Sequence, residues 1–173
     1  MKFKTFLAGC LGGLLSLNSC TNSPDMTDYA AYVNPFIGTG GHGHTFPGAI
    51  VPHGMISPSP DTRIDGWDAC SGYYYADSTI NGFSHTHLSG TGCCDYGDVL
   101  LMPTVGEQKY LPTGSQSQQM AYASAFSHQN ETAEPGYYSV FLDTYQVKAE
   151  LTASKRACLL YTSPSPRDMR RSR

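Results

Sequence analysis

Residues 136–152, GYYSVFLDTYQVKAELT, carry the clearest secondary-structure pattern in this sequence. Apolar side chains occupy alternate positions at residues 138–142 and again at residues 147–151, and Asp143-Thr144 lies between the two runs. Alternation with a period of two is typical of a strand that has one buried and one solvated face. The stretch therefore predicts an antiparallel hairpin.

The composition of the whole chain also favours strands over helices. Of the 173 residues, 14% are charged and 12% are aromatic, and the chain holds 18 glycines and 11 prolines. Aromatic residues favour strands, glycine and proline favour turns, and the length suits one domain. We predict an all-β fold, an antiparallel β-sandwich over residues 29–157, with further strands at residues 72–75, 80–83 and 99–102.

The distribution of charge argues against one class of ligand. The formal net charge is −3, but residues 20–157 alone carry five basic side chains against thirteen acidic ones. Such a surface repels phosphate backbones, so we expect no nucleic-acid binding. An acidic domain that is rich in aromatic side chains suits neutral, polar ligands better.

The first twenty residues resemble a bacterial export signal. Lys2 and Lys4 precede an apolar run at residues 6–17, which is too short to span a bilayer. The next residues, LNSC at 17–20, are similar to a lipobox, whose cysteine receives lipid. We expect residues 1–19 to be a lipoprotein-type signal peptide, Cys20 to be lipidated and residues 20–28 to be a polar tether to the bacterial cell envelope, in the periplasm or at the outer-membrane surface. An ordinary cleaved signal, with Cys20 there by chance, is the alternative.

The last sixteen residues, CLLYTSPSPRDMRRSR at 158–173, do not continue the pattern of the domain. The β alternation stops there and the charge becomes basic. A basic tail that binds a partner is one interpretation, and a frame-shifted or adaptor-derived read-through is the other. We favour the second and treat this tail as foreign to the domain.

Residues 81–98 concentrate polar and glycine residues, and three kinds of chemistry compete for them and for the other histidines. A metal site would draw on the histidines at positions 42, 44, 53, 85 and 87, which suit zinc or another transition metal. No glutamate follows either H-x-H pair at metalloenzyme spacing, so we assign no metal ligands. Nucleophilic catalysis by Ser84 with His85, or by Cys93, lacks the strand–turn–helix context. A polar rim for carbohydrate, with Trp67 stacked on a sugar face, agrees best with the composition.

The cysteines of the central region are odd in number, so they cannot form a complete disulfide framework. After Cys10, Cys20 and Cys158 are set aside, three remain, at positions 70, 93 and 94. One bridge from Cys70 to the 93–94 pair and free thiols both stay open.

Ten short motifs follow one another in order along residues 32–156. They are VNPFIGTG (33–40), HGH (42–44), FPG (46–48), SPDT (59–62), GWD (66–68), CSGY (70–73), FSHTHLSGTG (83–92), DYGD (95–98), PGYY (135–138) and ELT (150–152). Together they resemble the N-terminal domain of glycoside hydrolase family 92, the bacterial exo-acting α-mannosidases. Two departures are Tyr74, where the family commonly has histidine, and Cys94, where it often has serine.

The resemblance implies a β-sandwich that packs against a C-terminal (α/α)6 barrel, which is absent from this chain, with the active site between them. Family enzymes remove terminal α-linked mannose from N-glycans or mannan with inversion, and they depend on calcium that binds the mannose hydroxyls. The acid, the base and the calcium ligands belong to the C-terminal domain. We therefore expect an α-1,2-mannosidase-like function for the whole protein, and no activity, catalytic residue or calcium site in this chain alone.

The resemblance carries over few individual residues. Trp67 is similar to the aromatic residue that the family domain offers to the leaving-group side of the substrate, and Asp68 lies next to it. His85 and His87 would lie near the domain junction, as ligand contacts or as scaffold. We predict these four as substrate-binding residues. The alternative function is a non-catalytic surface lipoprotein that binds glycans.

Overall fold

The structure is a computed structural model that describes residues 27–63, 65–107 and 120–154. The predicted signal peptide, Cys20, most of the tether and the tail at 158–173 lie outside the described residues, and they stay predictions. Within the described residues, no helix has the length and hydropathy that a membrane crossing requires.

A three-stranded antiparallel sheet forms one layer of the domain, with the strand order β5-β6-β7. Its strands are β5 (Glu131–Glu134), β6 (Tyr137–Leu142) and β7 (Val147–Thr152). Leu142 pairs with Val147 at the closed end of the β6–β7 hairpin, and burial alternates strictly along β7. This pairing confirms the predicted hairpin. The period-two pattern of apolar side chains explains it, since it places one face of the sheet in the core.

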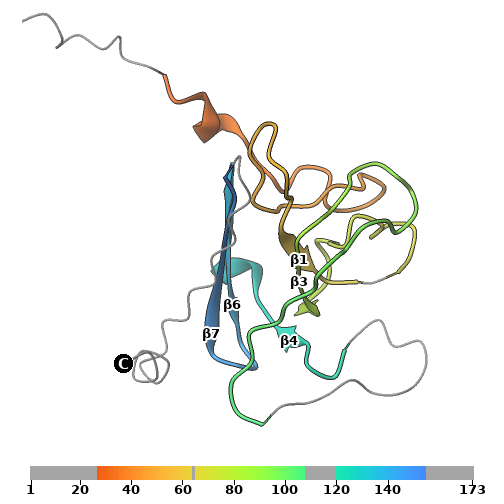
Figure 1. Ribbon diagram of the computed structural model, residues 1–173, viewed down its shortest axis with the longest axis vertical. Coiled ribbons are helices and arrows are strands. Elements are labelled where there is room, and N and C mark those ends of the chain that lie inside the picture. The colour runs from red at the N-terminus through yellow and green to blue at the C-terminus, as the bar shows by residue number, and fades with distance from the viewer. Residues whose placement is uncertain (1–26, 64, 108–119, 155–173) are drawn as a thin grey trace, which may run out of the picture.

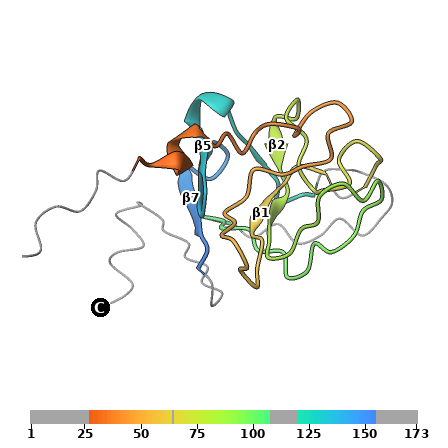
Figure 2. The ribbon, with the colours of Figure 1, turned by 90° about the horizontal axis from the view of Figure 1, so that it is seen from above.

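The second layer is built from loops and two short strand pairs. β1 (Ser59–Asp61) pairs with β3 (Gly82–Ser84), and β2 (Thr79–Ile80) pairs with β4 (Ser124–Ala125), both antiparallel. Two single-turn 3-10 helices, η1 (Tyr29–Tyr32) and η2 (His128–Asn130), complete the elements. Figures 1 and 2 show the loop-rich part of the chain on the β1–β3 side, away from the β5–β7 sheet.

The two layers share one hydrophobic core. The β6–β7 hairpin contributes Tyr138, Val140, Leu142, Ala149 and Leu151, and the other layer contributes Ala49, Ile80, Phe83 and Phe126. All nine side chains are buried. The described part of the chain is therefore all-β with antiparallel pairing, as predicted, although the strands of the second layer are short.

A buried carboxylate links the layers. Glu131 accepts hydrogen bonds from the hydroxyls of Tyr73, at 3.0 Å, and Tyr138, at 2.7 Å, and it lies 2.6 Å from Nδ1 of His128. Burial, and next the charge of Glu131, raises the pKa of both tyrosine hydroxyls well above the ordinary tyrosine range. Both hydroxyls therefore stay protonated and keep donating to the carboxylate.

Three predicted strands of the second layer need correction. Residues 72–75 are not a strand, because Gly72 takes a φ of +88° and a hydrogen bond from the backbone N–H of Tyr74 goes to the Thr62 hydroxyl. Residues 80–83 divide at Asn81 between β2 and β3. Of residues 99–102, only Leu101 makes a strand-like bridge, to Phe83.

Candidate functional site

Three loops from different parts of the sequence meet around Trp67. The loops contain residues 42–44, 66–68 and 90–92. The backbone N–H of Gly90 donates to the carbonyl of His44 at 2.8 Å, which joins the first of these loops to the third. Gly92 lies so close to the indole that a Cβ atom there would come within 2.6 Å of the ring. Gly92 also has a φ of +68°, so both the backbone and the contact require glycine.

Trp67 packs against neighbouring residues on one part of its ring and is otherwise open to solvent. The ring of His44 meets it edge-on, with centroids 4.9 Å apart and an interplanar angle of 85°. The residue is 61% exposed. A large aromatic ring that is fixed by its neighbours and still accessible is suited to stacking on an apolar face of a ligand.

Asp68 lies beside Trp67 and binds a histidine from another loop. Its Oδ1 atom is 2.6 Å from Nδ1 of His42, whose side chain is 80% exposed. His42 and His44 lie two positions apart, and in an extended strand they would share one face. The segment is instead a turn in which His44 has a φ of 54°, and both imidazoles reach the Trp67–Asp68 site.

His87 lies in the interior, where protein groups occupy both of its ring nitrogens. Nδ1 is 2.8 Å from the Ser57 carbonyl, and Nε2 is 2.8 Å from Oδ1 of Asp61 and 3.0 Å from the Ser84 hydroxyl. Ser84 also donates from its hydroxyl and its backbone N–H to Oδ2 of Asp61, at 2.6 and 2.8 Å. Of the two roles open for His87, this geometry favours scaffold, and contact with substrate stays a prediction.

The Asp61–His87–Ser84 group contains the three residue types of a hydrolytic triad in a different arrangement. In a triad the serine and the carboxylate bind opposite nitrogens of the imidazole, so that the histidine can pass a proton between its two partners. Here both approach the same Nε2 atom, and all three residues are buried. The group thus acts as a polar support under the loops. Its carboxylate, Asp61, lies in the SPDT motif at 59–62, to which the sequence alone assigns no role.

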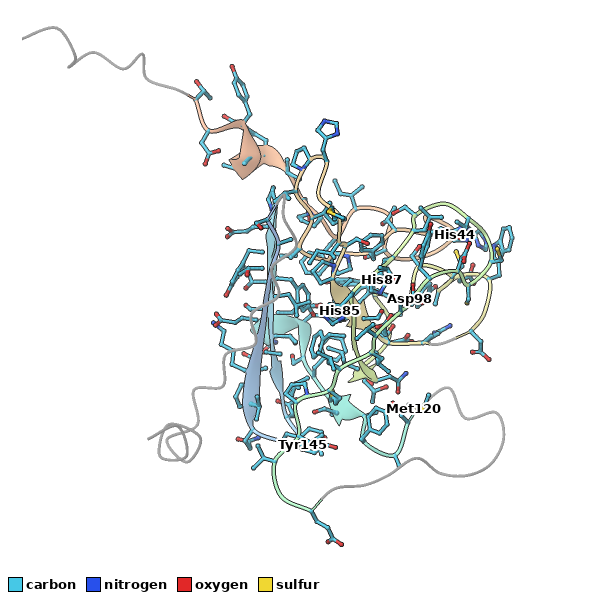
Figure 3. The ribbon with its side chains drawn as sticks, viewed as in Figure 1. His44, His85, His87, Asp98, Met120 and Tyr145 are labelled. Carbon is cyan, nitrogen blue, oxygen red and sulfur yellow. The ribbon has the colours of Figure 1, made fainter. Side chains whose placement is uncertain are left out.

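His85 lies apart from the Trp67 site. Its Nδ1 atom is 2.7 Å from the carbonyl of Val99, and its backbone N–H donates to the carbonyl of Asp98. Figure 3 shows His85 and His87 well separated from His44. The structure therefore brings two of the four predicted residues together, Trp67 and Asp68, and adds His42 and His44 to them.

A pocket of about 150 Å³ lies between the His87 support and the loop at residues 94–97. Arg63 lines it, but its guanidinium makes a bidentate ion pair with Asp77, and this hydrogen bonding raises the pKa of Arg63. The buried Cys70 and the exposed Cys94 also line it, and both are free thiols. The positive charge of Arg63 is thus already paired with Asp77, which weakens its attraction for an anion in the pocket.

Calcium, which the family resemblance implies, does not fit the described residues. Calcium takes about six to eight oxygen ligands. Within the described ranges, one group of at least three metal-ligating side chains comes together, and it offers two imidazoles and one carboxylate, from His42, His44 and Asp68. This donor set is too poor in oxygen for calcium.

Known proteins are similar to this chain in sequence and in fold. Residues 32–168 match the Glycosyl hydrolase family 92 N-terminal domain. A family GH92 α-mannosidase from Bacteroides thetaiotaomicron, solved with mannoimidazole, is 50% identical with a TM-score of 0.66, over 73% of this chain and 17% of that one. A family GH92 inverting mannosidase from the same organism is 32% identical with a TM-score of 0.58, over 78% of this chain and 18% of that one.

An uncharacterized secreted glycosidase from Arthroderma benhamiae is 32% identical over 135 residues, which are 78% of this chain and 17% of that protein. The chain thus spans less than a fifth of the length of these relatives. The family match extends past residue 157, the end that the sequence pattern predicts for the domain, and that boundary stays a prediction. With an ordered match over most of its length and a shared fold at 50% identity, the chain belongs to glycosyl hydrolase family 92, through the N-terminal domain of that family.

Proposed function

We propose that this chain is the N-terminal domain of a calcium-dependent exo-α-mannosidase, and that it supplies a sugar-facing surface rather than the reacting groups. Two solved family relatives are mannosidases, and this chain spans only 17% and 18% of their lengths. The substrate class proposed for the whole protein is terminal α-linked mannose in N-glycans or mannan, cleaved with inversion.

The observation that carries the proposal is the accessible indole of Trp67, against which His44 and Gly92 pack. Pyranose rings have an apolar face of C–H groups that stacks on aromatic rings, and their hydroxyls need polar partners nearby. Asp68 and His42 lie at the same place and can accept or donate hydrogen bonds. We propose that Trp67 and Asp68 contact the leaving-group side of the mannoside.

We propose that the catalytic acid and base, and the calcium ligands, come from a later part of the full protein. An inverting pair stands roughly 6.5–9.5 Å apart with room for a water molecule between them. Two buried carboxylates of this chain are committed to structure: Asp61 to Ser84 and His87, and Glu131 to two tyrosines and His128. Neither is free to act on a substrate.

The test uses the full-length gene product and an α-mannoside disaccharide. Removing the ring with Trp67→Ala loses stacking worth about 0.5–1.5 kcal/mol, so we expect kcat/KM to fall roughly 2- to 13-fold, while Trp67→Phe recovers part of it. Chelation of calcium should abolish mannose release. The proposal fails if the full-length protein releases no mannose with calcium present, or if Trp67→Ala leaves kcat/KM unchanged.

The alternative is a non-catalytic glycan-binding lipoprotein, which the accessible Trp67 on this chain would also serve. The reading frame after codon 157 separates the two functions, because a helical domain encoded there supports the enzyme and a verified stop supports the binding protein. We propose a lipid anchor at Cys20 in either case. Membrane-bound protein after Cys20→Ala would contradict the anchor without affecting the proposed enzyme.

A further inference from the structure

The group formed by His42, His44 and Asp68 joins two loops that are far apart in the sequence. One ligand atom from each of the three side chains lies within 4.8 Å of the other two. Ligand atoms around a tetrahedral zinc ion lie about 3.3 Å apart, given bonds of about 2.0 Å. His42 is 80% exposed, so its side chain can make the small adjustment that closes the site.

His44 supplies a second observation that points to a ligand. The residue is 9% exposed, and its Nε2 atom is buried without a hydrogen-bond partner. Buried polar atoms are nearly always paired in folded proteins, so an unpaired one in a polar group indicates a partner that the chain does not supply. A second imidazole and a carboxylate nearby make a cation the fitting partner.

We propose that His42, His44 and Asp68 bind one divalent transition-metal ion of the zinc class beside Trp67. Two imidazoles and one carboxylate with one open position are a common zinc donor set, and imidazole also suits nickel and copper. The ion would fasten the 42–44 loop to the 67–68 turn. This site is separate from the calcium of the proposed function, because its donors are mainly nitrogen.

The other described histidines do not take part. His85 and His87 bind carbonyl and carboxylate oxygens of their own surroundings, and His128 binds Glu131. His53 is exposed on a separate loop. The inferred site thus uses two of the five histidines that the sequence analysis considered and set aside as metal ligands, with Asp68 as the new member.

The tryptophan beside the site serves as a built-in probe, since Trp67 is the single tryptophan of the chain. His44 lies 4.9 Å from the indole, so a bound nickel(II) ion should quench its fluorescence. Nickel(II) chloride is titrated into the full chain at constant ionic strength, with calcium chloride as a parallel titration. We expect saturable quenching at one ion per chain, reversal by added zinc, which does not quench, and no effect of calcium.

His42→Ala and Asp68→Asn each remove one exposed or half-exposed ligand and should leave the fold intact. Mutating a residue that only supports a metal ligand weakens metal affinity by roughly 10- to 100-fold. Losing a ligand itself should therefore weaken nickel binding by at least that factor. His53→Asn is the control for His42→Ala, because it removes an exposed imidazole from a separate loop, and asparagine tolerates the left-handed backbone of residue 53. It should bind nickel within about twofold of the parent chain.

Cys94→Ser tests a competing ligand, since the Cys94 thiol lies 3.7 Å from the carbonyl of Gly66, which precedes Trp67 in the chain. Binding that survives Cys94→Ser and is lost in His42→Ala supports the site. Absence of saturable quenching, equal weakening by His53→Asn, or loss of binding in Cys94→Ser would each overturn it. None of these measurements uses a sugar, so they stand apart from the test of mannosidase activity.

Discussion

Gly72 occupies a position where backbone conformation and space both exclude a side chain. Its φ is +88°, and a Cβ atom would lie 2.4 Å from Oδ1 of Asp61 and 3.0 Å from the ring of His87. The Asp61–His87–Ser84 support can therefore form only around a glycine.

Gly72→Ala should destabilise the protein by about 3 kcal/mol or more, through left-handed strain of roughly 1 kcal/mol plus displacement of Asp61. Gly90→Ala is the matched control, because Gly90 has a φ of +75° and a Cβ atom there would meet nothing within 4 Å. Gly90→Ala should therefore lose only the roughly 1 kcal/mol of left-handed backbone strain. Urea unfolding measures both, and equal losses would contradict the contact with Asp61.

The thiol of Cys94 offers a test of local electrostatics. Although the residue is exposed, partial burial of the thiol raises its pKa first, followed by the nearby Cys70, Asp65 and Cys93. The folded chain therefore holds the thiol proton to higher pH than the unfolded chain does. Consequently, this group lowers stability as the pH rises above the pKa of the unfolded thiol, which is about 8.5.

The measurement is the rate of iodoacetamide alkylation of Cys94 against pH, followed by peptide mass spectrometry. We expect the midpoint of the rate profile to lie at higher pH in the folded chain than in the same chain in urea. Cys94→Ser identifies the peptide that carries the signal. Identical midpoints in the two states would refute the influence of burial.

At the scale of elements, the β6–β7 hairpin is the part of the core where two neighbouring positions can be compared directly. Leu151 is fully buried against the second layer, whereas Thr152 is half-buried on the other face of β7. Leu151→Ala should lower the free energy of unfolding by about 2–5 kcal/mol, since it leaves a cavity in the shared core. Thr152→Ala should cost less than about 1 kcal/mol. Equal losses in urea titrations would mean that β7 does not bury the predicted face.

The same hairpin shows why part of the fold can be predicted from sequence. Residues 137–152 form strands through their own alternation, so the pattern is local and readable. Residues 72–75 have the aromatic composition of a strand, but tertiary contacts set their conformation. The backbone N–H of Tyr74 binds Thr62, and the hydroxyl of Tyr73 binds Glu131, which is 58 residues away. Composition cannot reveal such partners, because they are set by tertiary contacts.

At the scale of the whole molecule, the site also combines residues that sequence alone can group with residues that only the fold brings together. Trp67 and Asp68 adjoin in sequence, so they can be predicted together, and the structure keeps them together. His42 and His44 join them only because Gly90 binds the His44 carbonyl and brings three loops to one place. The family resemblance adds His85 and His87 to the predicted substrate-binding residues. In the structure they bind Val99 and Asp61, and their contact with substrate stays a prediction.

The two layers of the domain should unfold as one unit, because they share a core and the buried Glu131. Tyr73, in the loop layer, donates to Glu131 of β5, and Tyr138 of β6 donates to the same carboxylate. Trp67 fluorescence reports on the loop layer, and far-ultraviolet circular dichroism reports mainly on the strands. A two-state domain gives coincident transitions by both probes, so we expect one urea midpoint.

Tyr73→Phe tests whether the carboxylate is part of that coupling. It removes a donor from a buried charge, so the free energy of unfolding should fall by about 1–3 kcal/mol, with both probes shifting together. Tyr137→Phe is the matched control, because the Tyr137 hydroxyl binds Glu150 on the half-exposed face of one sheet, where Lys148 also binds that carboxylate. Its loss should stay below about 1 kcal/mol, since water can replace the hydroxyl. If fluorescence changed at lower urea than circular dichroism in the parent chain, the loop layer would be folding independently, and the proposed sugar-facing surface would not be held by the core.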